Sequence, residues 1–76
     1  SKMVNKQYKK VQIELENDYN LEELKEVLKE EGETKINIIL NNNNVKFDIE
    51  LKKTRKFDLN TFNYVKTKQY VKKISF

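Results

Sequence analysis

The 76-residue sequence has no cysteine, histidine, proline, tryptophan or alanine, and it has a single glycine. Without cysteine there is no disulfide framework and no thiolate metal site. Without histidine the commonest general base and the commonest metal ligand are missing. One glycine is too few for a glycine-rich phosphate loop. We therefore expect a domain without catalytic residues, metal ion or cofactor.

Long apolar runs are also missing. The longest is Ile38–Leu40, far shorter than the roughly 20 residues that span a bilayer, and no stretch is typical of a signal peptide. We expect a cytoplasmic chain with no membrane contact and no evident small-molecule ligand. Asp48 and Glu50 alternate onto one face of a predicted strand, roughly 7 Å apart. Such a pair can hold a divalent ion, but pairing with lysines across the sheet is the favoured interpretation.

Charge is abundant and segregated along the chain. Residues 14–33 carry nine acids and two lysines, a net charge of −7, whereas residues 34–76 carry nine lysines, one arginine and three acids, a net charge of +7. Either the two halves pair locally across a solvated surface, or the basic half contacts a partner or nucleic acid. The bias toward lysine and asparagine also fits A/T-rich codon usage. The candidate contact residues are Lys52, Lys53, Arg55, Lys56, Lys66, Lys68, Lys72 and Lys73.

Hydrophobic periodicity predicts an α+β fold. Apolar residues alternate with polar ones in the segments YKKVQIELE, TKINIIL and VKFDIEL. This two-residue period is typical of β-strands. Two helices are predicted, one from Asn20 and a shorter one after Asp58, because Asn and Asp are good N-caps. The last strand, YVKKISF, has imperfect spacing that a β-bulge would explain. The order is β-α-β-β-α-β, typical of a split βαβ or ferredoxin-like domain with two helices on one face of a four-stranded sheet.

This pattern also predicts which faces are buried. The odd-numbered apolar residues of the first and third strands, and the even-numbered ones of the second and fourth, should form the core. The RNA-recognition motif shares the element order, but it needs aromatic residues on the open face. The third strand offers Lys46, Asp48 and Glu50 there, so that motif is excluded.

Three local features carry further expectations. The run Asn41–Asn44 predicts a hairpin turn, because Asn tolerates positive φ better than other residues with a side chain. Gly32 is placed to end the first helix as its left-handed C′ residue. Glu30 and Glu31 would then crowd the negative end of the helix dipole, so we expect a basic neighbour or partner beside them.

Domain organisation follows from the same pattern. Residues 1–7 lack periodicity and are predicted to be a disordered or cloning-derived lead, and residues 8–76 form one domain. Ser1 stands where an initiator methionine is expected, which suggests a piece cut from a longer chain or a cleavage scar.

Four segments follow one another in the order KEEGETKINIIL, VKFDIEL, RKFDLNTFNYVK and YVKKISF. In these segments the sequence resembles the C-terminal domain of the bacterial replicative DNA polymerase III alpha subunit. The resemblance covers most of residues 11–76. It implies a non-catalytic interaction domain that tethers the polymerase to the clamp-loader tau subunit in DNA replication, with additional DNA contact as an option. The matching residues are Leu24, Leu28, Gly32, Thr34, Ile36, Ile38, Leu40, Phe47, Ile49, Leu51, Phe57, Leu59 and Phe62.

Two rival functions stay open. A small basic nucleic-acid-binding domain would use the lysines of the last third and lose affinity steeply with salt. A ligand-sensing regulatory domain of the same element order would dimerise through sheet edges, but it needs a glycine-rich loop that this sequence lacks.

Overall fold

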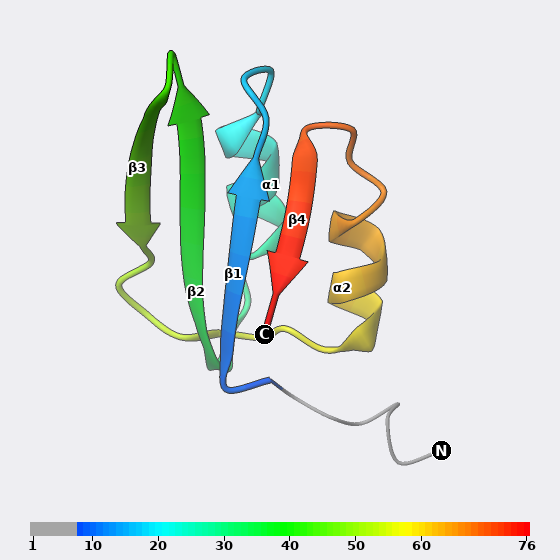
Figure 1. Cartoon of the computed structure of the whole chain (residues 1–76). Coiled ribbons are helices and arrows are strands. Elements are labelled where there is room, and N and C mark those ends of the chain that lie inside the picture. The colour runs from blue at the N-terminus through cyan, green and yellow to red at the C-terminus, as the bar shows by residue number, and fades with distance from the viewer. Residues whose placement is uncertain (1–7) are drawn as a thin grey trace.

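The structure, a computed structural model, describes residues 8–76, and the predicted lead over 1–7 lies outside the described residues. Figure 1 shows an α+β domain in which both helices lie on the same side of one sheet. This confirms the predicted class and the β-α-β-β-α-β order. The elements are β1 (Lys10–Leu15), α1 (Leu21–Val27), β2 (Glu31–Asn42), β3 (Val45–Glu50), α2 (Leu59–Val65) and β4 (Val71–Ser75).

The strand order within the sheet is β3-β2-β1-β4. β1 pairs directly and in parallel with β2, with Val11 opposite Ile36. The ferredoxin-like expectation differs here, because in a split βαβ unit another strand lies between these two. In β2 the apolar residue Ile39 lies on the face that otherwise carries polar residues, so apolar and polar residues alternate less strictly in β2 than in β3. The most apolar strand therefore takes a central place, and the charged β3 lies at the edge.

The core forms between the sheet and the helices, and the inward residues of β1 and β2 are buried as predicted. The prediction is wrong for the first half of β3, where Val45 is 52% exposed and Phe47 is 49% exposed, whereas Ile49 packs against the core. Each helix has only seven residues, and neither lies behind β3 (Figure 1). The fully buried large side chains are Val11, Ile13, Leu15, Leu24, Leu28, Ile36, Ile38, Phe57 and Val65.

Both predicted N-caps are confirmed. The side chain of Asn20 accepts a hydrogen bond from the Glu23 N–H (3.0 Å), and Asp58 accepts one from the Thr61 N–H (3.0 Å). These bonds satisfy N–H groups that have no partner inside the helix. The two caps therefore fix where each helix begins.

The predicted helix end is wrong. α1 ends at Val27 with Leu28 as its cap, and Gly32 lies inside β2 without a positive φ. The guanidinium of Arg55 instead donates to the Leu28 carbonyl (3.0 Å). Because a distant side chain satisfies this carbonyl, the helix needs no left-handed residue to end it.

The asparagine run forms the predicted hairpin turn, in a narrower form. β2 extends through Asn42 and β3 starts at Val45. Only Asn43 (φ 52°) and Asn44 (φ 66°) form the loop. Positive φ at both central residues defines a type I′ turn, whose twist matches that of the flanking strands. The turn therefore sets the register of β3 against β2.

The imperfect spacing of β4 reflects the predicted bulge. Ile74 pairs with Ile13 and Lys73 with Glu14, but Leu15 pairs with Val71 after a register shift. The extra residue, Lys72, restores the phase, so that Val71 and Ile74 both pack against the core. The bulge thus lets two lysines stand between two inward-facing apolar residues.

Candidate interaction surfaces

The segment Thr54–Lys56 is clasped to the end of α1 and the start of β2. The Lys56 N–H donates to the Glu30 carbonyl (2.8 Å), and the Gly32 N–H donates to the Thr54 carbonyl (3.3 Å). A Cβ on Gly32 would lie 2.5 Å from the Cα and N atoms of Lys56. The glycine is therefore required by close backbone approach, rather than by its conformational freedom. We call this arrangement the 54–56 clasp.

The expected basic neighbour of the two glutamates is present in the clasp. Lys56 Nζ lies 3.3 Å from Glu30 Oε2, and Arg55 forms an isolated β-bridge with Glu31. Both glutamates lie beyond the end of α1, because the helix is shorter than predicted. Within residues 8–76, Glu31 itself makes no ion pair.

The eight basic candidates differ in how far they are occupied within the fold. Lys56 also lies 3.9 Å from Asp58, Lys68 lies 3.5 Å from Glu23, and Lys72 lies 3.7 Å from Glu14. The amine of Lys66 lies over the Phe62 ring, 5.1 Å from its centroid. In the part of the chain that the structure describes, Lys52, Lys53 and Lys73 make no ion pair.

These basic residues do not gather on one surface. Residues 52–56 belong to the connection that runs along one end of the sheet, whereas Lys66 and Lys68 follow α2 toward the other end (Figure 1). Lys72 and Lys73 lie on the edge strand β4. The positive charge of the last third is thus divided among three places.

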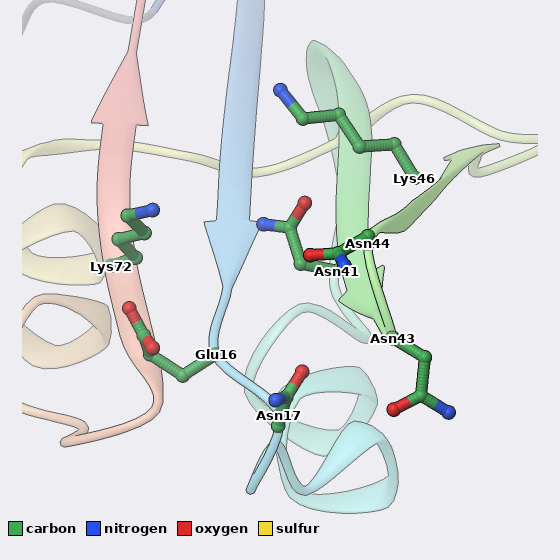
Figure 2. A pocket seen from close by; sticks show the side chains of 7 residues that line it. All are labelled: Glu16, Asn17, Asn41, Asn43, Asn44, Lys46 and Lys72. Carbon is green, nitrogen blue, oxygen red and sulfur yellow. The ribbon is translucent and has the colours of Figure 1, made fainter.

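A polar depression of about 600 Å³ lies on the open face of the sheet, where β1 and β2 end. Figure 2 shows Lys72 on one side of it and Lys46 on the other. Beside it, Glu14 accepts a hydrogen bond from Asn41 (3.0 Å). This bond, together with Lys72 and Lys46, lowers the pKa of Glu14 despite partial desolvation. Lysines and carboxylates balance one another here. Among residues 8–76 no group of three metal-ligating side chains occurs.

A second charged cluster joins the two helices to β4. The buried Tyr70 hydroxyl donates to Glu23 Oε1 (2.7 Å). This hydrogen bond is the largest cause of the lowered pKa of the Glu23 carboxyl, and Lys68 adds to it. Burial and the same glutamate raise the pKa of the Tyr70 phenol. The cluster holds α1 against the start of β4, which is a structural role.

The exposed edge of the sheet at β3 is the surface that sequence reasoning missed. Leu51 N–H donates to the Ile36 carbonyl (3.0 Å), which fixes the phase of the β2–β3 ladder. Because hydrogen-bonding direction alternates along a strand, the backbone groups of Phe47 face β2. Those of Lys46, Asp48 and Glu50 face outward, and within residues 8–76 no strand pairs with them. We call this surface the β3 edge.

A signal for the exposure of the β3 edge exists in the sequence. Lys46, Asp48 and Glu50 give β3 the most strictly charged outer face of the strands, which is typical of an edge position. The first helix pattern is too short to cover three strands. Alternation alone indicates which side of a strand is apolar, without indicating what covers that side.

Searches with this chain against protein-family models, curated proteins and solved structures gave no match. Among residues 8–76, neither helix is long and apolar enough to cross a membrane.

Proposed function

We propose that this chain is a non-catalytic interaction domain of the type found at the C-terminus of the bacterial DNA polymerase III alpha subunit. In this role it tethers the polymerase to the clamp-loader tau subunit in the cytoplasm. The proposal starts from the sequence resemblance, and one structural observation supports it. Two segments that carry much of the resemblance, KEEGETKINIIL and RKFDLNTFNYVK, contact each other in the 54–56 clasp.

The 54–56 clasp explains structurally why these two segments occur together. Gly32 leaves room for the backbone of Lys56, Arg55 caps the helix at Leu28, and Phe57 then enters the core fully buried. A sequence that has one of these two segments needs the other segment to form the same local structure. The two segments together are therefore stronger support for a shared domain type than two independent apolar patterns.

The alternative function, a small basic nucleic-acid-binding domain, has weaker support. Phosphate contact requires cations that are free to release counterions on binding. Arg55, Lys56, Lys68 and Lys72 are already engaged with carbonyls or carboxylates of the same chain. The remaining cations are spread over separate parts of the fold.

Both functions are tested on one isotope-labelled sample of the 76-residue chain. We expect that the C-terminal domain of the tau subunit, added at tens of micromolar, shifts a contiguous set of backbone amide signals. A duplex DNA of unrelated sequence serves as the comparison ligand at low salt. Unchanged amide signals with tau would overturn the proposal. Shifts with DNA alone, centred on Lys52, Lys53 and Lys73 and lost on adding salt, would favour the alternative.

A further inference from the structure

The two edges of the sheet differ in how well they are protected. β4 carries Lys72, Lys73 and a bulge, all of which are common devices against edge-to-edge pairing. β3 has no bulge against β2, and it exposes Val45 and Phe47 on its apolar side. An edge strand that is charged on one face only, without a bulge and with exposed apolar side chains on the other face, can still pair with another strand.

The charges on the β3 edge indicate which strand fits. Along its outward face the order is Lys46, Asp48, Glu50, so the strand carries opposite charges two residues apart. In an antiparallel pair centred on Phe47, Lys46 of each copy lies opposite Asp48 of the other. Opposite charges at directly facing positions stabilise a sheet pair.

We propose that the β3 edge binds a second copy of this chain, as an antiparallel two-fold pair centred on Phe47, and so joins two four-stranded sheets into one. The backbone groups of Lys46 and Asp48 face away from β2 and pair with no other strand among residues 8–76, so they lie in phase for this pairing. Phe47 then meets Phe47 of the second copy, and Val45 meets Ile49. The exposed apolar side of β3 is thereby continued across the two copies.

Neighbouring registers are disfavoured by like charges. A pair centred on Lys46 brings two lysines together, and one centred on Asp48 brings two aspartates together. A pair centred on Ile49 places Asp48 opposite Glu50. Like charges at directly facing positions are destabilising, so electrostatics favours the register centred on Phe47. This inference is independent of the tau subunit.

Charge exchange tests both the pairing and its register in the 76-residue chain. Sedimentation equilibrium over a concentration series should show a weak dimer, because one short strand buries less area than a standard interface. Lys46→Asp or Asp48→Lys alone should weaken association by at least about tenfold, since two attractive pairs become repulsive. An equimolar mixture of the two variants, and the double variant K46D/D48K, should both recover it. Lys53→Asp has the same charge change as Lys46→Asp, lies outside β3, and should associate like the parent chain.

Cysteine trapping provides a second measurement, because the chain has no cysteine of its own. In the proposed register the two Phe47 positions face each other as a non-hydrogen-bonded pair, at Cα separations suited to a disulfide. Phe47→Cys should therefore form a covalent dimer on mild oxidation. Val45→Cys should not, because its two copies lie about 13 Å apart along the strand.

Several results would overturn the inference. A parent chain that stays monomeric at its solubility limit is one. Failure of the mixed variants to associate is another, provided that circular dichroism shows each variant to be folded. Equal cross-linking of both cysteine variants would exclude this register. Binding to the tau domain is measured separately, so a negative result for either proposal does not decide the other.

Discussion

Replacing Gly32 should destabilise the domain through the 54–56 clasp. In Gly32→Ala the added Cβ lies 2.5 Å from Lys56 Cα and N and 2.7 Å from the Arg55 carbonyl carbon. These are backbone atoms, so no side-chain rotation relieves the contact and the segment must move. Movement weakens the bonds from Lys56 N–H to Glu30 O and from Arg55 to Leu28 O.

The expected cost follows from three contributions. Overpacking of this kind costs about 1–3 kcal/mol, and weakening two hydrogen bonds costs about 1 kcal/mol each. The lower entropy of the unfolded chain offsets about 0.4–1 kcal/mol. We expect the free energy of unfolding to fall by about 2–5 kcal/mol, a large share of the stability of a small domain.

The assay is urea denaturation followed by circular dichroism, with Gly32→Asn as the decisive second variant. If Gly32 served as a left-handed helix cap, Asn would be tolerated nearly as well as glycine. Close backbone approach predicts instead that Gly32→Asn is at least as damaging as Gly32→Ala. Glu33→Ala is the matched control, because Glu33 is exposed on the same strand. An Asn variant within about 0.5 kcal/mol of the parent chain, the range of ordinary surface substitutions, would refute this account.

Three further predictions concern the turn and the charged clusters. Asn44→Ala should lower the free energy of unfolding by about 1 kcal/mol, because an ordinary side chain is unfavourable at positive φ. Asn44→Gly should be at least as stable as the parent chain in urea denaturation. The reverse ranking of these two variants would contradict the type I′ turn. Tyr70→Phe should cost about 1 kcal/mol and raise the pKa of Glu23, followed by carboxyl NMR; an unchanged Glu23 pKa would show that the hydrogen bond to Tyr70 does not control it. The folded state lowers the pKa values of the Glu14, Glu23 and Asp58 carboxyls, so their ionised forms stabilise the fold at pH values above the ordinary carboxyl pKa. This stability is lost as the pH falls through the folded-state pKa values, and the urea midpoint should therefore decrease below about pH 5. Equal urea midpoints from neutral to strongly acidic pH would argue against this prediction.

Local chemistry allowed much of the fold to be predicted from sequence. Asn20 and Asp58 start the helices because their side chains accept nearby N–H groups. Asn43 and Asn44 form the turn because they tolerate positive φ. The alternation of Val11 and Ile13 with polar residues indicated their burial. Each of these outcomes depends on residues within a few positions of one another.

The misses all depend on distant contacts. The end of α1 is decided by Arg55, which lies far along the chain from Leu28. The role of Gly32 depends on the backbone of Lys56. The sheet order and the uncovered β3 edge depend on which strands become neighbours, and a two-residue period contains no information about neighbours. Predicted candidates such as Lys56 and Lys72 were identified as charges, but their partners are set by the tertiary fold.

The pairing of β1 with β4 has a consequence for how the chain reaches its folded state. β1 is a central strand, yet one of its two partners is the last strand, with Ile13 opposite Ile74. Such non-local pairing slows folding, because the intervening chain must close before the contact forms. While the end of the chain is unplaced, β1 is itself an open edge of an unfinished sheet. The arrival of β4 replaces that apolar edge with one rich in lysine, so we expect β4 also to protect the newly folded domain from aggregation.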